Sequence, residues 1–455
     1  MARRLWWIFA LLVAGVVGGW TQAQSGRSAP HGAAARLTAA DQTFLLDLEQ
    51  RAFQFFWDGG DPNTGINREH LYTNGEPFPA GRRDIGSTGA TGFGITAMCI
   101  GAEHGWISRD QARERVLNTL RYYAERAPEE HGWYYHWLNV KSGARTGANY
   151  DTAALGERAD RKMKRPLSEI SVSDSTWLVA GALTAARYFK EDPEMARLAK
   201  KIYERVDYAW MRNGDPYLLA HGWLPETGFI QARYDKYCQL ALMYLMGIGS
   251  PTHALPAESW YAWKRDPNSY AGYSYIGTSL LWTYQYPFAW ADFRGKRETR
   301  GMHTDWWQNA ITATKAHRQF CIDLKKQFPG YGENIWGITS SEGRTGYKAW
   351  GGPPAKGGID GTVVPCAPAG SLMLTPEISL AALQAMKARF GDTVWNRYGF
   401  ADAFNPNTGW VSPEVLGIDV GITLLSAEDL RTGNVWKWFM ANPEIGRAMK
   451  LAGIE

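Results

Sequence analysis

Helix start signals recur along this chain, and apolar residues at helical spacing follow them. Ser108 to Gln111 reads as a capping box, and the apolar residues between Ala112 and Tyr123 then recur three and four positions apart. Asp192-Pro193 and Thr375-Pro376 each place a cap residue before a proline that suits the first helical position. The sequence shows no sustained strand alternation. We therefore predict an all-α fold.

Weaker helical patterns extend this prediction along the chain. They cover roughly residues 41–57, 87–103, 174–190, 235–249, 304–327 and 419–430. About ten to a dozen helices without a short exact repeat suit either an α/α toroid or a helical solenoid. Long irregular connections rich in Trp, Tyr, Gly, Asn and Asp favour the toroid, because ordered loops of this kind tend to carry function. Examples are residues 57–60, 133–137 and 331–369.

The N-terminus has the pattern of a secretory signal peptide. Arg3 and Arg4 precede an apolar run that ends at Trp20, and a small-residue cleavage site follows at residues 21–23. We predict a signal peptide over residues 1–23. A membrane anchor is the alternative, but the run is short for a spanning helix. The expected location is therefore periplasmic or extracellular, without a stable membrane anchor.

The rest of the chain divides into a short leader and one domain. Residues 24–36 are rich in Ser, Ala, Gly and Arg, which predicts a disordered leader. Residues 37–455 contain no Pro/Ser-rich linker and no break in composition, so we expect one large domain and a monomer.

Charge and motif content exclude several classes of function. The 49 Lys and Arg residues nearly balance the 45 Asp and Glu residues, and both signs are spread along the chain. Nucleic acid is therefore not an expected partner. The sequence lacks dinucleotide, phosphate-loop and His-Glu-x-x-His motifs, so we expect no cofactor and no metal. Disulfides or buried free thiols are both open for the four cysteines, Cys99, Cys238, Cys321 and Cys366.

The aromatic content is compatible with sugar binding. The chain has 22 Trp and 22 Tyr residues, and such rings stack on the apolar faces of pyranose rings while Asp, Glu, Asn and Arg bind the hydroxyl groups. Aromatic side chains also build helical cores, which is the alternative explanation. The candidate stacking platforms are Trp57, Trp133, Trp336 and Trp350.

Several motifs occur in a fixed order along the chain. They are Thr91–Gly94, Glu169–Asp174, Gly249–His253, Trp336–Thr339, Asp360–Thr362, Tyr398–Phe404 and Gly417–Gly421. In this order they resemble motifs of the bacterial glycoamylase-like superfamily, and the resemblance covers nearly all of residues 37–455. It implies an (α/α)₆ barrel, or toroid, whose long aromatic-rich loops form a β-glucan-binding cleft at one end. The superfamily contains endo-β-1,2-glucanases and the transglycosylase domains of cyclic β-1,2-glucan synthases.

Carboxylates at the motif positions are the candidates for glycoside hydrolysis, which commonly needs one acid and one base. We predict acid, base or water-positioning roles for Asp174 and Asp419, although each also suits a helix N-cap. Glu169, Glu333 and Asp402 are predicted to hold sugar hydroxyls or to orient catalytic groups. Glu169 follows the basic residues 161–165, so a salt bridge is its alternative role.

One motif departs from the family pattern. The resemblance implies a glutamate ten residues before Gly249 as a leading candidate for the general acid, but this chain has Gln239 there. An amide cannot donate a proton as an acid, although it can hold a sugar hydroxyl. Asp235 is expected one helical turn earlier, on the same face as Gln239, and is a candidate substitute.

Three functions are therefore compatible with the sequence. The first is a secreted glycoside hydrolase that acts on β-glucan, with β-1,2-linked glucose as the expected substrate and an acid moved to Asp235 or Glu333. The second is a glycan-binding protein without hydrolytic activity. The third is a transglycosylase on activated or cyclic β-1,2-glucan. We favour the hydrolase, because the other motif carboxylates are present.

Overall fold

The computed structural model describes residues 37–79, 82–147 and 167–455. The predicted signal peptide, the predicted leader and the basic residues 161–165 lie outside the described residues. Across the described ranges, no helix combines the length and apolar character needed to span a membrane.

The described residues are predominantly helical. The longer helices are α1 (Ala39–Gly59), α2 (Thr88–Glu103), α3 (Arg109–Glu125), α4 (Val172–Tyr188), α5 (Pro193–Glu204), α7 (Leu240–Gly249), α9 (Trp306–Asp323), α11 (Pro376–Val394), α12 (Gly417–Arg431) and α14 (Pro443–Ala452). The shorter ones are α6 (Tyr208–Met211), α8 (Ser259–Ala262), α10 (Cys366–Gly370), α13 (Asn434–Met440) and the 3₁₀ helices η2 (Leu281–Tyr284), η3 (Tyr286–Ala289) and η4 (Leu324–Lys326).

The fold also contains short strands, which the prediction of an all-α chain did not include. They form small sheets of two or three strands within the connections. Eight of those described are β4 (Glu129–Glu130), β5 (Trp133–Tyr134), β10 (Pro267–Tyr270), β11 (Tyr273–Ile276), β12 (Trp395–Asn396), β13 (Gly399–Phe400), β14 (Phe404–Asn405) and β15 (Trp410–Val411).

Local capping explains where the predicted helices begin. Ser108 accepts a hydrogen bond from the Gln111 amide, and the Gln111 side chain accepts one from the Ser108 amide, which confirms the capping box of α3. Asp192 caps α5 by accepting from two backbone amides. Thr375 precedes α11 without a side-chain cap, because its hydroxyl bonds to Ser371 and Ser379 instead.

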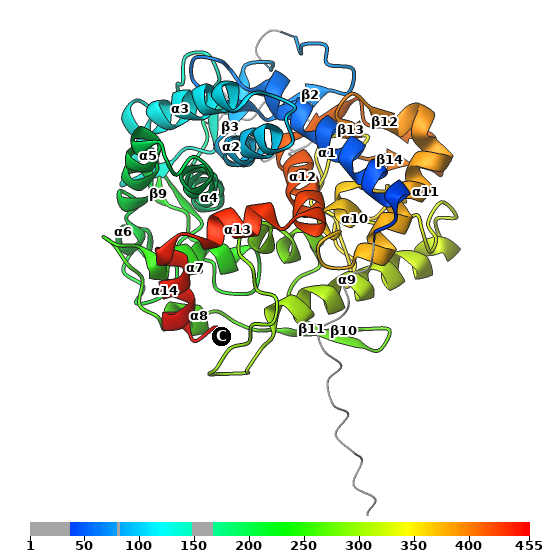
Figure 1. Cartoon of the computed structure of the whole chain (residues 1–455). Helices are drawn as coiled ribbons and strands as arrows, with labels where there is room; N and C mark the ends of the chain where they lie inside the picture. Colours follow the sequence, from blue (N-terminus) through cyan, green and yellow to red (C-terminus); the bar gives the residue numbers. More distant parts are fainter. Residues whose placement is uncertain (1–36, 80–81, 148–166) are drawn as a thin grey trace, which may run out of the picture. The chain divides into compact units, whose positions relative to one another are not determined.

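Helix α2 lies at the centre of the N-terminal half of the fold. It packs against α4 and α12, and also contacts α1 and α3 (Figure 1). Glycines allow the closest approach: a β-carbon at Gly92 would lie 2.2 Å from the Trp177 carbonyl oxygen, and one at Gly181 would lie 2.3 Å from the Gly92 carbonyl oxygen. The Gly-rich sequence of α2 therefore brings its backbone against that of α4.

A short strand ends immediately before each of α2, α4 and α12. These strands are β3 (Ile85–Ser87), β7 (Ile170–Ser171) and β16 (Glu414–Leu416). They pair with β1 (Asn67–Arg68), β6 (Trp137–Asn139), β2 (His70–Tyr72) and β8 (Gly222–Leu224), and β8 pairs in turn with β9 (Gly228–Phe229). The antiparallel pairing fixes the backbone just ahead of the first turn of each helix.

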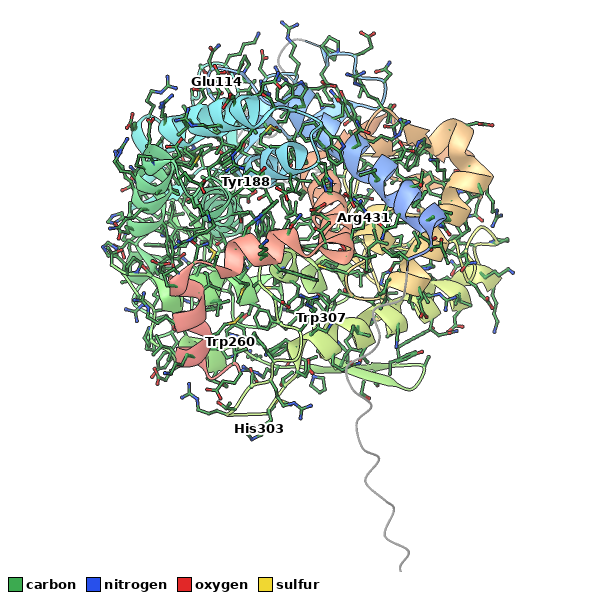
Figure 2. The ribbon with its side chains drawn as sticks, viewed as in Figure 1. Glu114, Tyr188, Trp260, His303, Trp307 and Arg431 are labelled. Atoms are coloured by element: carbon green, nitrogen blue, oxygen red, sulfur yellow. The ribbon has the colours of Figure 1, made fainter. Side chains whose placement is uncertain are left out.

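Aromatic side chains fill much of the space between the helices (Figure 2). Trp260 and Trp306 are fully buried, and both indole N–H groups donate to the buried carboxylate of Glu298 at 2.7 and 3.0 Å. Arg265 forms an ion pair with the same carboxylate at 2.8 Å.

All four cysteines are free thiols. Of the two alternatives left open by the sequence, disulfides or free thiols, the structure therefore has free thiols.

Candidate active site

Asp174 lies in the first turn of α4, where the strand β7 ends. The helix cap is Ser171, whose hydroxyl accepts from the Asp174 amide and donates to the Asp174 carboxylate at 2.5 Å. Asp174 is therefore not itself the N-cap, and the cap-only explanation is wrong. Burial raises the pKa of Asp174 above its usual range. A β-carbon at Gly89 would lie 2.3 Å from Asp174 Oδ1, so the carboxylate rests on the first turn of α2.

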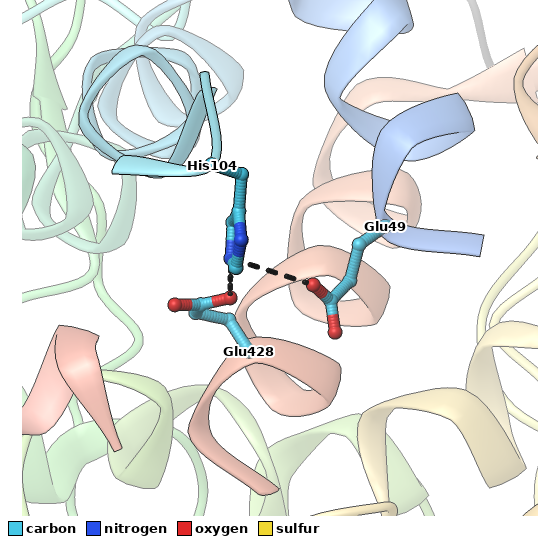
Figure 3. A group of neighbouring side chains, drawn as sticks. All are labelled: Glu49, His104 and Glu428. Atoms are coloured by element: carbon cyan, nitrogen blue, oxygen red, sulfur yellow. Dashed lines mark hydrogen bonds and ion pairs between the residues drawn. The ribbon is translucent and has the colours of Figure 1, made fainter. Parts of the chain in front are cut away.

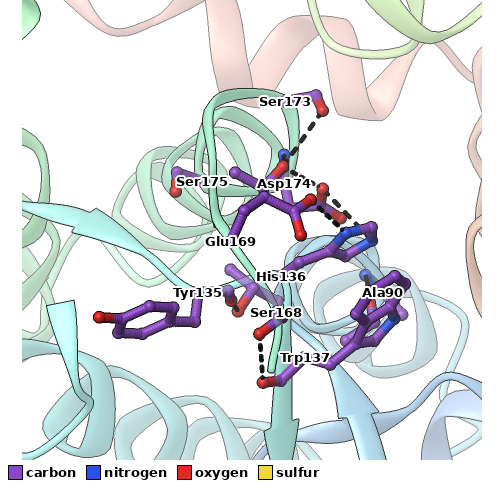
Figure 4. A network of polar contacts seen from close by, with 12 residues as sticks. Ala90, Tyr135, His136, Trp137, Ser168, Glu169, Ser173, Asp174 and Ser175 are labelled. Carbon is purple, nitrogen blue, oxygen red and sulfur yellow. Dashed lines mark hydrogen bonds and ion pairs between the residues drawn. The ribbon is translucent and has the colours of Figure 1, made fainter. Parts of the chain in front are cut away.

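His136 connects Asp174 with Glu169 (Figure 4). Its Nδ1 lies 2.9 Å from Glu169 Oε1, and its Nε2 lies 3.6 Å from Asp174 Oδ2. The imidazole stacks on Trp137, with the ring centroids 3.7 Å apart. Burial opposes the charged form, but the attraction of Asp174 and the hydrogen bond to Glu169 raise the pKa of His136 to about 9. The imidazole is therefore cationic at neutral pH.

Asp419 occupies the equivalent position in the first turn of α12. It makes no capping bond, because Leu416 is the cap residue, so the cap-only explanation is wrong here too. Its Oδ1 accepts a hydrogen bond from the Tyr286 hydroxyl at 3.0 Å. Burial raises the pKa of Asp419 to about 6, although hydrogen bonds from Asp402 and Tyr286 oppose the shift.

Asp402 and Asp419 form a pair of buried carboxyl groups joined by a hydrogen bond. Asp402 Oδ2 accepts from the Glu342 amide at 2.6 Å. Outside this pair, Asp402 Oδ1 and Asp419 Oδ2 have no hydrogen-bond partner among the described residues. Burial and the charge of Asp419 raise the pKa of Asp402 well above its usual range. Each member of the pair therefore opposes ionisation of the other.

A second histidine lies beside this pair. His70 Nδ1 is 3.2 Å from Glu414 Oε2 and 3.9 Å from Glu342 Oε1. Arg82 donates to both oxygens of Glu414, at 2.6 and 2.5 Å. Burial opposes the charged form of His70, but the hydrogen bond to Glu414 and the charges of Glu69, Glu414 and Glu342 together outweigh it and raise the pKa. These side chains supply both signs of charge next to Asp402.

Glu69 links the two groups of carboxylates and lies in none of the motifs described above. Its amide donates to the Ile85 carbonyl, and its carbonyl accepts from the Gly417 amide, so its backbone is fixed between β3 and the start of α12. Its charge acts on His136 and Asp174 on one side and on Asp419 on the other. The buried Glu69 Oε2 has no hydrogen-bond partner among the described residues. Glu69 therefore belongs to the candidate site.

Three predicted site residues lie apart from these clusters or make other contacts. Asp235 pairs with Lys264 at 3.7 Å in an irregular segment. The prediction that Asp235 shares a helix face with Gln239 is wrong, because α7 begins only at Leu240. Gln239 is half-buried at the cap position of α7 and makes no capping bond. The Glu333 side chain is exposed, and only its carbonyl is bonded, to Arg318.

The predicted stacking residues are mostly buried. Trp133 donates its indole N–H to the Asp207 carbonyl at 2.9 Å, and Trp350 donates to the Ser341 hydroxyl at 3.2 Å. Trp336 is also fully buried, and Trp57 is half-buried against the Arg115 guanidinium. Stacking needs an exposed ring face, and Trp57 is the member of this set that is not fully buried, so the role of all four stays a prediction.

Two other tryptophans lie next to the catalytic candidates. Trp137 stacks on His136, and Trp282 packs against Tyr286 with the ring centroids 5.2 Å apart. Both tryptophans are half-buried. Each ring contact is local in sequence, but His136 lies beside Asp174 and Tyr286 beside Asp419 only in the folded chain, so composition alone could not identify these tryptophans.

A separate cluster of titratable groups lies at the C-terminal ends of α2 and α12 (Figure 3). His104 Nε2 is 2.7 Å from Glu428 Oε2 and 3.9 Å from Glu49 Oε2. Arg431 also donates to Glu49 Oε2, at 2.5 Å. The spacing of the three ligand atoms is short enough for a metal ion, as it is in the cluster of His70, Glu342 and Glu414. Arg431 already supplies a cation to Glu49, so the arrangement is explained as an ion-pair network between α1, α2 and α12.

The arrangement of helices matches that of known α/α-toroid proteins. The endo-β-1,2-glucanase of Chitinophaga pinensis, solved with sophorotriose and glucose, superposes with a TM-score of 0.79 at 26% identity, over 91% of this chain and 98% of that one. A β-1,2-glucanase of Parabacteroides distasonis superposes with a TM-score of 0.78 at 25% identity, over 90% of this chain and 60% of that one.

Sequence comparison gives the same relationship. The family described as "Putative glucoamylase" matches residues 231–443. The exo β-1,2-glucooligosaccharide sophorohydrolase (non-reducing end) of Parabacteroides distasonis is 26% identical over 441 residues, which is 89% of this chain. The chain spans only 57% of the length of that relative. In both sequence and fold the chain is thus similar to glycoamylase-like proteins, among them an endo-β-1,2-glucanase.

Proposed function

We propose that this protein is a glycoside hydrolase that cleaves β-1,2-linked glucan. The three named relatives act on β-1,2-glucans or their oligosaccharides, and two of them superpose on nearly the whole described chain. The proposal includes a β-glucan as the bound partner and needs no cofactor, because carboxyl groups alone can perform the reaction.

The observation that carries the proposal is the pair of buried carboxylate centres on neighbouring helices. Asp174 stands at the start of α4, and Asp419 stands at the start of α12, with α2 in contact with both helices. Hydrolysis needs one group that protonates the departing oxygen and one that activates water. Asp419 is ionised above a pH of about 6 and takes the proton from water, while Asp174 faces the departing oxygen.

The neighbouring polar groups then bind and orient the substrate. Glu69 Oε2 and Glu342 Oε1 are buried acceptors without a donor among the described residues. Sugar hydroxyls are donors, and hydrogen bonds from them would satisfy these oxygens. Glu169 and Asp402, predicted from the sequence as substrate-binding or orienting residues, act instead through His136 and Asp419 in this scheme.

The proposal extends to the architecture and the location of the protein. We propose that residues 37–455 close into an (α/α)₆ barrel with a glycan cleft at the end where α2, α4 and α12 begin. The domain is proposed to act as a monomer in the periplasm or outside the cell, after removal of residues 1–23. Support for export comes from the basic residues, apolar run and cleavage pattern of that segment.

Gln239 supports a second candidate function. The amide occupies the position at which the family resemblance implies an acid, and neither Asp235 nor Glu333 replaces it in this structure. A protein without a proton donor there would bind β-glucan in the same site without cleaving it. Transglycosylation on an activated or cyclic glucan is the third possibility, because acid assistance matters less with a better leaving group.

The test is an incubation of the purified mature protein with linear and cyclic β-1,2-glucan, beside β-1,3- and α-1,4-glucans. Products are separated by chromatography, and binding is measured in parallel by calorimetry. Shorter oligosaccharides from β-1,2-glucan alone are the expected result. Binding without products would identify a glycan-binding protein, longer products would identify a transglycosylase, and neither binding nor products would refute the assignment to β-1,2-glucan.

A further inference from the structure

His136 bridges a solvent-accessible carboxylate and a buried one. The Glu169 side chain is 27% exposed, whereas that of Asp174 is 5% exposed. The imidazole lies between them, with its Nδ1 toward Glu169 and its Nε2 toward Asp174 (Figure 4). Each of the two ring nitrogens therefore has a carboxylate partner, and the three side chains form a continuous path from the surface to the buried carboxylate.

The surroundings keep this imidazole charged and fix its plane. Three carboxylates face it: Glu169 before β7, Asp174 on α4 and Glu69 between β1 and β2. Their attraction raises the pKa of His136 to about 9 despite burial. The stacked Trp137 ring, inclined by 14°, holds the imidazole plane. A cationic imidazole held by two carboxylates has a proton on each nitrogen.

We propose that His136 supplies the proton that Asp174 delivers to the departing sugar oxygen, which replaces the acid absent at Gln239. This inference rests on the proposed hydrolysis. His136 acts through Asp174, so it is a positioning and proton-supplying residue and does not itself touch the substrate. The Nε2 to Asp174 separation of 3.6 Å has to shorten in the substrate complex, as hydrogen bonds of free active sites commonly do.

The proton balance of the step is complete. As the glycosidic C–O bond breaks, the ionised Asp174 takes the Nε2 proton of His136 and passes a proton to the departing oxygen, so Asp174 ends the step ionised again. Water forms the new bond to the anomeric carbon and gives its proton to Asp419. The imidazole is then neutral and keeps its Nδ1 proton against Glu169. Exchange with solvent at the partly exposed His136 and Glu169 reprotonates the imidazole, and Asp419 gives its proton to water that enters after the products leave.

The first arm of the test compares two substrates with the variant His136→Gln. With β-1,2-glucan, kcat/KM should fall about 100-fold, which is the usual range for loss of general acid catalysis. With 2,4-dinitrophenyl β-sophoroside, the fall should be less than about threefold, because a dinitrophenolate leaves without a proton. His131→Gln is the matched control, since His131 also lies beside two carboxylates, Glu130 and Asp207, but is outside the site.

Equal losses with the two substrates, at unchanged thermal stability, would show that His136 only shapes the site and would overturn the proposal. Activity equal to wild type with β-1,2-glucan would overturn it as well. Glu169→Gln gives a second variant that keeps the imidazole. Its kcat/KM should also fall more with β-1,2-glucan than with the dinitrophenyl substrate, but by a smaller factor than in His136→Gln.

The second arm does not depend on turnover. NMR titration of ¹³C-labelled histidine, assigned with the His136→Gln spectrum, should give a pKa for His136 near 9. In Asp174→Asn this pKa should fall toward the ordinary histidine value of about 6.5. A wild-type protein that cleaves no β-1,2-glucan would refute the proposed function, and an unchanged pKa of His136 in Asp174→Asn would refute the coupling between the two residues.

Discussion

The carboxylate of Asp174 rests directly on Gly89, at the point where the first turns of α4 and α2 meet. A β-carbon at position 89 would lie 2.3 Å from Asp174 Oδ1 and 2.7 Å from the Trp177 ring. The backbone of Gly89 is helical, so alanine fits its conformation but not its space. Gly89 therefore sets the position of a proposed catalytic group without any functional group of its own.

Gly89→Ala should lower kcat by about 10- to 100-fold, because a shift of about 1 Å in a catalytic group has an effect of that size. The helix itself should remain folded, as measured by circular dichroism. Gly446→Ala in α14 is the matched control, because a β-carbon there meets nothing within 4 Å. Unchanged kcat in Gly89→Ala would mean that Asp174 tolerates displacement.

Asp174→Asn should abolish turnover of β-1,2-glucan, with a loss of at least about 100-fold, while the protein stays folded. The amide keeps the shape of the carboxylate and can still accept from the Ser171 hydroxyl, but it cannot deliver a proton. Initial rates and thermal unfolding curves measure the two effects separately. Wild-type rates in this variant would remove Asp174 from the catalytic set.

Asp419→Asn should lower activity and raise stability at neutral pH. The pKa of Asp419 in the folded protein, about 6, lies above the unfolded value of about 3.9, so ionisation of the folded form costs free energy as pH rises through this window. Asparagine removes that cost, and a gain of about 1 to 2 kcal/mol is typical for such a functional residue. The free energies of unfolding at pH 7.5 and pH 4 test this: the gain should be present at pH 7.5 and shrink at pH 4.

The plot of activity against pH should be bell-shaped, with its acid limb at a pH of about 6 and its alkaline limb at a pH of about 9. Below a pH of about 6 Asp419 is protonated and cannot take a proton from water. Above a pH of about 9 His136 loses the proton that Asp174 needs. A pH profile of kcat/KM measures both limits. Loss of the alkaline limb in His136→Gln, with the acid limb kept, is expected, whereas an unchanged alkaline limb would exclude His136 as its source.

Gln239→Glu should raise the hydrolysis of β-1,2-glucan about tenfold or more if a direct acid at this position is more effective than the path through His136. Residue 239 is half-buried at the start of α7, which packs against α4, so a carboxyl group there stands next to the helix that carries Asp174. The measurement is the rate of product formation from β-1,2-glucan as the sole substrate, compared between the variant and the wild type. No increase would mean that the proton already arrives efficiently by another route.

The helices were predictable where the signal is local. The capping box at Ser108 and the Asp192-Pro193 start confirm this, because each depends on residues within one turn. Asp235 shows the limit: apolar residues continued the helical pattern backwards from α7, but residues 235–239 are irregular and Asp235 pairs with Lys264 instead. The hydrogen bonds and the ion pair of Asp235 join two segments of the chain whose proximity cannot be predicted from the sequence.

The candidate site was predictable only in part. The motif positions of Asp174 and Asp419 followed from the family resemblance, and the structure places both in equivalent first turns. Glu69 and His136 were not among the predicted site residues, because what places them in the site is contacts made on folding: Glu69 with β3 and α12, and His136 with Glu169. The tryptophans illustrate the same limit, since composition does not separate the buried Trp133 from a ring beside the site such as Trp137.

The short strands ahead of α2, α4 and α12 have a consequence for how this chain can change. They anchor the first turns that carry Asp174 and Asp419, independently of the long connections elsewhere in the fold. Side chains of residues 331–369 other than Glu342, whose amide bonds to Asp402, can therefore be exchanged while the groups that move protons keep their positions. Substitutions in the loops can in this way change the substrate preference of the domain without changing the groups that break the bond.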